Sequence, residues 1–385
     1  KLVQQASVAG SFYFGSKVLP KFLLQALGPI YKMVQKKWMV PTTTEVLNKL
    51  GASEKLKAVL ASQWGYYGAT PNNSSFMIHG ITTKHFLSGG FYPVGGAKSF
   101  ADHLIPVIEA AGGALKTRTR VEKVLIDAAG KTTGVLLQNG TEIKCSTVIS
   151  ATGAKSTISK LLPENIQTSD WAKEISQLKQ SPAYVTLYMG FEGDITKGGA
   201  TKSNQFHFRK WDLEDGTWNV NDKTKPAPFV YISFPSLKDP THNGGPEQKH
   251  TGEIVTFVPW ECFEQWKHTR RGKREADYME FKKGIEEKML AHFLEVLPGM
   301  KPYLKFHELS TPLSTQFFLE APQGAIYGLD PTPNRFLTKA LQTRTPIPGF
   351  YMSGCDVATL GVVGALVGGI LTAGTLEKGV LKHLV

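Results

Sequence analysis

The 385-residue sequence has few cysteines and lacks the patterns that indicate a metal site or a disulfide framework. Its three cysteines, Cys145, Cys262 and Cys355, are far apart and form no CxxC pair. That spacing gives no argument for a zinc site or a disulfide scaffold, and it favours a reducing compartment. The ten histidines form no HExxH motif. We therefore expect no metal at the functional site.

An initiating methionine is also missing, and the first residues, KLVQQASVAG, do not form a secretory signal. We expect that a longer protein continues upstream of Lys1. Hydrophobic residues at 41% and charged residues at 20% are typical of a folded globular protein rather than a disordered one.

Acidic residues are fewer than basic ones, 32 against 44, which gives a net charge of +12. This balance favours anionic partners such as lipid headgroups, nucleotides or nucleic acid, although a solvated basic surface is the plainer interpretation. The basic residues are dispersed, and the one cluster, at 267–274, reads as a solvated loop before a helix. We expect no nucleic-acid partner.

Residues 17–39 alternate apolar and lysine side chains but are broken by Pro20 and Gly28-Pro29. The pattern predicts short amphipathic helices that either lie in the plane of a membrane interface or pack as a helical hairpin on the core. Residues 42–80 are expected to be largely helical.

From Gly89 the pattern becomes that of an α/β domain. A helix is predicted at 97–111 with one apolar face, and short strands follow at 114–117, 121–127, 134–137, 142–144 and 147–151. Asn139-Gly140 predicts a tight hairpin. Between 163 and 311 the aromatic and β-branched runs predict a mostly antiparallel sheet, followed by a charged helix at about 273–297.

Near the end, TPIPGFYMSGCDVATLGVVGALVGGILTAG combines many glycines with one acid, Asp356. Three structures compete for it: a membrane span, an ordinary buried helix, or a backbone that approaches a cofactor. Its glycines lower hydrophobicity and helix propensity, and a short strand precedes it. Since a helix amino end offers unpaired N–H groups and a positive dipole, the order strand, glycine, acid, helix favours a cofactor.

This stretch, together with GGFYPVGGAKSFADHLIPVIEAAGGALKTRTRVEKVLIDAAGK, resembles the retinol saturases within the wider flavoprotein group of phytoene desaturases and carotenoid isomerases. The resemblance is good over 89–153 and about 322–374 and weak between them. It implies a Rossmann-like FAD-binding domain whose N-terminal βαβ unit is missing from this chain, an inserted mostly antiparallel substrate domain and a helical membrane-facing region. The implied segments are 1–88 helical, 89–162 and 322–385 FAD-binding, and 163–321 substrate domain.

By that resemblance, FAD is the cofactor. Phe91, Tyr92 and Tyr327 would lie near the flavin and an apolar substrate tunnel. His79, His85, Tyr92 and Tyr327 are possible proton donors, but no catalytic residue stands out from packed structural side chains. The FAD-binding positions would be Val121, Thr152, Gly153, Gly354, Asp356, Gly361, Val362, Val363 and Gly364.

One motif of the family is absent, because no GxGxxG occurs in the sequence. The FAD diphosphate would then need an upstream segment or another chain to complete its site. The resemblance implies a peripheral, membrane-associated FAD-dependent oxidoreductase or isomerase, on the reducing side of a membrane, that acts on C=C bonds of a carotenoid, retinoid or similar lipid. The alternative is a non-catalytic relative or fragment that serves as a scaffold or subunit.

Overall fold

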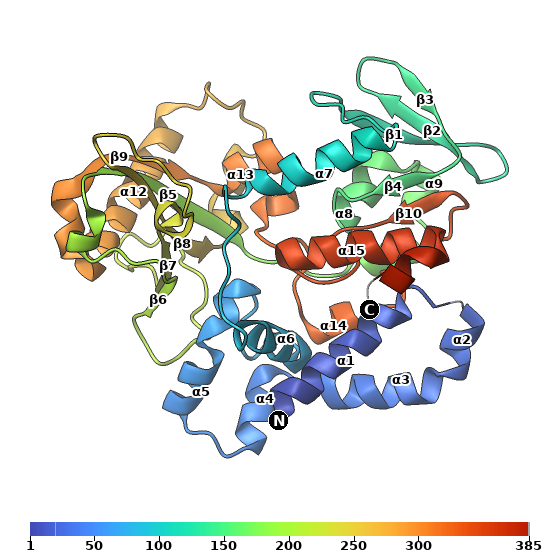
Figure 1. Ribbon diagram of the computed structural model, residues 1–385, viewed down its shortest axis with the longest axis horizontal. Helices are drawn as coiled ribbons and strands as arrows, with labels where there is room; N and C mark the ends of the chain where they lie inside the picture. The colour runs from blue at the N-terminus through green and yellow to red at the C-terminus, as the bar shows by residue number, and fades with distance from the viewer. Residues whose placement is uncertain (20, 384–385) are drawn as a thin grey trace. The chain divides into compact units, whose positions relative to one another are not determined.

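A computed structural model describes residues 1–19 and 21–383, and its contacts divide the chain into two compact units (Figure 1). Unit 1 contains Lys1–Ser88, Arg118–Ser181 and Ile326–Val385, and unit 2 contains Gly89–Thr117 and Pro182–Ala325. The breaks expected from the sequence, after residues 88, 162 and 321, differ from this division. Gly89–Thr117 clusters with the antiparallel sheet of unit 2 instead of with the expected FAD-binding segment, and unit 1 continues to Ser181.

Unit 1 begins with short helices, as the interrupted apolar pattern predicts. Thr42 caps one of them with a capping box, in which its hydroxyl accepts from the Glu45 N–H while the Glu45 carboxylate accepts from the Thr42 N–H. The helices are α1 (Leu2–Ser16), α2 (Lys21–Ala26), α3 (Gly28–Val34), η1 (Gln35–Met39), α4 (Thr43–Lys49), α5 (Glu54–Ala61), η2 (Ser62–Tyr66) and α6 (Phe76–Phe86).

A small antiparallel sheet and a parallel pair of strands follow in unit 1. β1 (Val121–Ile126), β2 (Thr132–Leu137) and β3 (Glu142–Lys144) form the sheet. The predicted turn at Asn139-Gly140 is confirmed, with Gly140 at φ +83°. The strand predicted at 114–117 is wrong, because that segment is irregular.

The parallel pair consists of β4 (Val148–Ser150) and β10 (Phe350–Met352), which are about 200 residues apart in sequence. Buried residues of α10 and of the 340–357 region pack against the pair. The other elements of unit 1 are α8 (Ala154–Ser156), η3 (Thr157–Leu161), α9 (Glu164–Gln167), α10 (Asp170–Ser176), α14 (Pro333–Leu337), α15 (Gly361–Leu376) and η9 (Lys378–His383).

Unit 2 is built on a five-stranded antiparallel sheet in the order β6-β7-β8-β5-β9. One face of β5, through Val185, Leu187 and Met189, is buried in the core together with the inner stripe of α12. The predicted antiparallel sheet and charged helix are therefore confirmed. The strands are β5 (Ala183–Glu192), β6 (Gln205–Phe208), β7 (Phe229–Ser233), β8 (Lys249–Val258) and β9 (Leu304–Ser310).

Helices of unit 2 differ in how they are buried. The long helix α12 (Ala276–Val296) buries Ile285 and Phe293 against the sheet. By contrast α7 (Lys98–Ala110), predicted at 97–111, buries none of its described residues, and Val107 is 67% exposed. The shorter elements are η4 (Ile195–Gly198), α11 (Pro235–Lys238), η5 (Trp260–Cys262), η6 (Glu264–Trp266), η7 (Pro298–Tyr303), α13 (Pro312–Leu319) and η8 (Pro322–Gly324).

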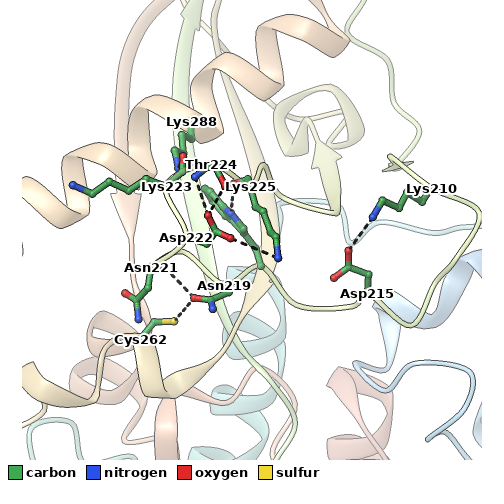
Figure 2. Close-up of polar contacts among 11 residues, drawn as sticks. Lys210, Asp215, Asn219, Asn221, Asp222, Lys223, Thr224, Lys225, Cys262 and Lys288 are labelled. Atoms are coloured by element: carbon green, nitrogen blue, oxygen red, sulfur yellow. Dashed lines mark hydrogen bonds and ion pairs between the residues drawn. The ribbon is translucent and has the colours of Figure 1, made fainter.

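The connection between β6 and β7 is held by side-chain contacts to its own main chain (Figure 2). Asp222 Oδ1 accepts from the Thr224 N–H at 3.0 Å and from its hydroxyl at 2.6 Å. Lys288 Nζ, on α12, donates to Lys223 O at 2.7 Å. These contacts order a long loop that the sequence alone shows only as a polar stretch.

Within residues 1–19 and 21–383, no helix combines the length and the apolar character that a bilayer crossing requires. The glycine-rich helix α15 has only 16 residues.

Candidate cofactor site

Two glycine turns meet at one edge of the parallel strand pair. β4 ends at Ser150 and leads into Thr152-Gly153, while β10 ends at Met352 and leads into Gly354. Because the strands are parallel, their carboxyl ends lie at the same edge, which is where ligands bind in open α/β sheets. The structure thus brings together four residues predicted from the sequence, the fourth being Asp356.

Asp356 fastens these turns to each other. Its Oδ2 accepts from the Ala154 N–H at 2.7 Å, and its Oδ1 accepts from the Leu329 N–H at 2.8 Å. The side chain is 2% exposed. Both oxygens are therefore engaged inside the protein, and the carboxylate is a structural clamp. That Asp356 also contacts FAD stays a prediction.

Glycine is required at two positions around this clamp. At Gly328, with φ +72°, an added Cβ would lie 2.4 Å from Asp356 Oδ1. At Gly368, on α15, an added Cβ would lie 2.4 Å from Gly354 O and 2.7 Å from Gly354 N. The helix therefore packs directly on the backbone of the turn, and a side chain at either position would separate them.

The amino end of α15 is the most accessible part of this region. Leu360 precedes it and provides no side-chain cap, and no acid occupies the first turn. Gly361 is exposed, as are Val362 at 58% and Val363 at 53%, whereas Gly364 is buried against Thr359 O. The first N–H groups of the helix have no intrahelical partner, and the dipole makes this end positive. It is therefore suited to negative charge or a polarised carbonyl.

Arg335, on α14, supports the clamp from behind, and the sequence analysis did not identify it. It is fully buried, and its guanidinium donates to Leu329 O, to Cys355 O at 2.6 Å and to Asp356 O at 3.4 Å. The Leu329 peptide is thus held by Asp356 on its N–H and by Arg335 on its carbonyl. The run TPNRF carried no signal beyond an arginine near a helix start.

Other buried charges lie close to Arg335. Burial, aided by the Arg335 charge, lowers the pKa of Lys17 to about 7, and its Nζ donates to Leu341 O. Burial raises the pKa of Asp330 to about 7, although Lys179 and Arg335 oppose the shift. Burial raises the pKa of Tyr13 to about 12. The interior beside the clamp therefore holds charged groups at an energetic cost.

Val121 occupies a different sheet from the two turns. It begins β1 and is the partner of Leu137 in the antiparallel ladder. The structure neither joins it to Asp356 nor tests its expected contact with FAD.

The suggested proton donors of unit 1 have structural partners. Tyr327 donates its hydroxyl to Gly65 O at 3.0 Å, and its N–H donates to Ser181 Oγ. His79 is buried, its Nδ1 lies 3.2 Å from Tyr67 Oη, and burial lowers its pKa to about 4. His79 is therefore packed inside the protein and neutral at physiological pH. His85 is exposed and lies edge-on to Phe86.

In unit 2, Phe91 and Tyr92 behave differently from each other. Phe91 is 87% exposed, whereas Tyr92 is half-buried with Lys238 Nζ 5.8 Å from its ring centroid. Lys238 also donates to Ser233 Oγ at 2.6 Å. Glu253, which is the strand partner of Ser233, has its pKa raised by burial while Lys238 opposes the shift. Sequence reasoning missed this Lys238–Glu253 pair, because it depends on strand register.

These features fit one end of FAD. Exposed helix amides, two clamped glycine turns and apolar side chains at Val362 and Val363 suit a flat ring and its sugar chain. A second helix amino end for the diphosphate would require a GxGxxG turn, which the sequence lacks. Within the described ranges, no three His, Cys, Asp or Glu residues are grouped to hold a metal.

A family model described as flavin containing amine oxidoreductase matches residues 41–376. The chain belongs to this family. A flavin is therefore its cofactor, and FAD is the form that the family supports.

Relatives similar in sequence include a retinol reductase and a phytoene desaturase. The chain is 33% identical over 346 residues to human all-trans-retinol 13,14-reductase, covering 87% of this chain and 57% of that protein. It is 24% identical over 293 residues to phytoene desaturase (neurosporene-forming) of Rhodobacter capsulatus, covering 74% of this chain and 52% of that protein. The chain thus spans little more than half the length of these relatives.

A solved structure shares the fold of this chain. An oxidoreductase from Methanosarcina mazei matches with a TM-score of 0.57 at 16% identity, covering 94% of this chain and 74% of that one. The mixed α/β fold of an FAD-binding oxidoreductase is confirmed. The missing N-terminal βαβ unit and the membrane-facing region stay predictions.

Proposed function

We propose that this protein is an FAD-dependent oxidoreductase that acts on C=C bonds of a long apolar polyene, such as a retinoid or a carotenoid. The observation that carries the proposal is the uncapped amino end of α15, which follows directly on the turn clamped by Asp356. The printed names of two relatives, which refer to retinol and phytoene, support the substrate class. Saturation, desaturation and isomerisation would share this site.

In this proposal the flavin supplies the hydride chemistry, and the chain supplies position and charge. The main-chain amides of Gly361, Val362 and Val363 would stabilise negative charge on the bound ring by about 0.3 to 2 kcal/mol through the helix dipole. Asp356 and Arg335 would fix the turn at Gly354 in the shape that permits close approach. Apolar Val362 and Val363 would keep water from this side of the ring.

We further propose that an additional strand completes the site, from an upstream segment or a separate chain. In the described part of the chain, β4 pairs with β10 alone. The Val148 N–H donates to Gly349 O, and Ser150 O accepts from the Ser353 N–H, so the peptide groups of Ile149 face the opposite side. Ile149 is 48% exposed. Parallel strands are normally covered on both sides, so this edge suits another strand.

Peripheral membrane association, on the reducing side, is the third part of the proposal. The helices α2 and α3 expose Phe22 at 67% and Met33 at 64%, and the exposed Lys32, Lys36 and Lys37 follow in the same stretch. Exposed apolar side chains beside lysines are typical of helices that lie in a lipid headgroup layer. An apolar polyene would reach the enzyme from that layer.

The test is titration of the purified protein with FAD, followed by flavin absorbance and equilibrium dialysis, in the present chain and in a longer natural form. We expect retained FAD in the longer form and anaerobic reduction or oxidation of the flavin by retinol or phytoene analogues. A colourless long form that ignores added FAD would contradict the proposal and favour the non-catalytic scaffold.

A further inference from the structure

A cavity of about 420 Å³ lies among α1, α2 and α3 in unit 1. Its size is within the range of about 300–1,000 Å³ that is usual for small-molecule sites. Val8, Phe12, Leu19, Leu24 and Leu27 supply an apolar lining. The cavity shares no residue with the turns around Asp356, and nothing in the proposed function accounts for it.

Three hydroxyl groups, those of Ser11, Ser16 and Tyr31, form the polar part of this lining. Ser16 Oγ donates to Tyr13 O at 2.6 Å and lies 3.5 Å from Tyr31 Oη. The single hydroxyl hydrogen of Ser16 is engaged with Tyr13 O, so Tyr31 Oη is the donor of the longer contact and keeps its lone pairs to accept a hydrogen bond from a ligand hydroxyl. Burial raises the pKa of Tyr31, so the hydroxyl stays protonated at neutral pH.

One wall of the cavity lacks a side chain. Gly15 lies in the last turn of α1, and an added Cβ there would meet no atom within 4 Å. Its backbone is helical, so glycine is not needed for conformation and costs about 0.5–1 kcal/mol of helix stability relative to alanine. Space for an occupant is a physical reason for glycine at this position.

The lining discriminates among classes of occupant. No lysine or arginine belongs to the described lining, so a carboxylate or phosphate would find no counter-charge there. A peptide would leave backbone groups unpaired against the leucines. A long hydrocarbon with one terminal hydroxyl matches both the apolar side chains and the hydroxyl groups of the lining. Such molecules dissolve in membranes, and α2 and α3 also carry the exposed Phe22 and Met33.

We propose that this cavity binds an apolar polyene alcohol, with the hydroxyl at Tyr31 and Ser16, and that it receives the substrate from the membrane. The identity of the ligand as a substrate rests on the proposed function, whereas its chemical class rests on the cavity. The probe is therefore all-trans-retinol, whose binding is read from fluorescence energy transfer without added FAD.

The first variant is Gly15→Leu, whose Cβ meets no protein atom and whose remaining side-chain atoms would take up space in the cavity. We expect its affinity for retinol to fall at least about tenfold while the melting temperature stays equal or rises. Gly284→Leu is the matched control, because Gly284 is an exposed helical glycine of α12 that also has no atom within 4 Å of an added Cβ. This control should bind retinol like the unmodified protein.

The second variant, Tyr31→Phe, removes the hydroxyl and keeps the ring. We expect about a three- to tenfold loss of retinol affinity and little change for retinyl acetate, whose oxygen cannot donate. Unchanged retinol affinity in Gly15→Leu would overturn the site. Equal effects on retinol and retinyl acetate, or equal displacement by phospholipid acyl chains, would overturn the alcohol as occupant.

Failure of the oxidoreductase proposal and failure of the cavity proposal give different experimental results. If the protein never retains FAD but loses retinol on Gly15→Leu, the cavity is a polyene-alcohol site and the oxidoreductase proposal fails. If FAD is retained and reduced while Gly15→Leu still binds retinol normally, the oxidoreductase proposal stands and the cavity proposal fails.

Discussion

Arg335 joins the two loops that carry Leu329 and Asp356, through contacts to three carbonyl oxygens. Arg335→Met would leave these buried carbonyls unpaired, and we expect a loss of about 3 kcal/mol in the free energy of unfolding. Urea denaturation measures the loss. Arg344→Met is the control, since exposed Arg344 donates a single bond to Thr375 O, and its loss should stay below about 1 kcal/mol. Equal losses would contradict the role given to Arg335.

Asp330 should make the protein less stable as pH rises from about 4 to 7. Its folded pKa is raised to about 7, whereas an unfolded aspartate titrates near 3.9. Between these values the folded state keeps a proton that the unfolded state has released, so raising the pH favours unfolding. In Asp330→Asn this decline should disappear, which urea denaturation at several pH values would show as a difference from the unmodified protein.

Burial of Lys17 should make the protein more stable as pH rises above 7, which is the opposite of the effect of Asp330. The folded pKa of Lys17 is lowered to about 7, while an unfolded lysine keeps its proton up to about pH 10.4. In that window the unfolded state binds more protons, and stability therefore rises with pH. Lys17→Met should abolish the rise. A variant curve parallel to that of the unmodified protein between pH 7 and 10 would show that Lys17 is not buried as described.

A substitution at Val362 should change the affinity for FAD without lowering the stability of α15. A carboxylate in the first turn favours an α-helix, so Val362→Asp should keep or slightly raise the melting temperature. The same charge would oppose the polarised carbonyl or negative charge that this amino end is suited to bind, and we expect FAD affinity in the longer form to fall about tenfold, against little change in Val362→Asn. A Val362→Asp variant that binds FAD normally would remove the amino end of α15 from the site.

At the scale of elements, two neighbouring glycines of α15, Gly368 and Gly369, allow a test of how closely this helix packs on the turn at Gly354. An alanine at Gly368 would bring its Cβ against the backbone of Gly354, and we expect a loss of about 1–3 kcal/mol or more. Gly369 faces open space on the same helix, so Gly369→Ala should gain about 0.5–1 kcal/mol. Thermal unfolding of both variants gives the comparison, and effects of the same sign would disprove the close contact.

Elements with local signals could be predicted, and contacts between distant segments could not. Asn139-Gly140 specifies its turn through backbone conformation, and the stripe of α12 follows its helical period. The apolar face of α7 looked equally convincing, yet it is exposed, because period alone does not say whether another element covers it. The glycine turns were found from their order, but the contacts of Asp356 with Ala154 and Leu329 depend on three separated segments.

At the scale of the whole molecule, vesicle binding should depend on α2 and α3 more than on net charge. We expect Phe22→Ser combined with Met33→Ser to abolish cosedimentation with neutral and anionic vesicles. The control combines Leu56→Ser with Val59→Ser, two exposed apolar residues of α5. Binding that survives the first pair and disappears only in high salt would indicate attraction of the +12 charge alone.

The pairing of β4 with β10 also has a consequence for synthesis. Roughly 200 residues must be translated after β4 before its partner exists, which takes about 10–40 s at ordinary ribosome speeds. During that time the nascent strand is bare on both edges, and it is apolar enough to pair wrongly. We expect a cell to shield this stretch with chaperones until the last glycine-rich helix emerges.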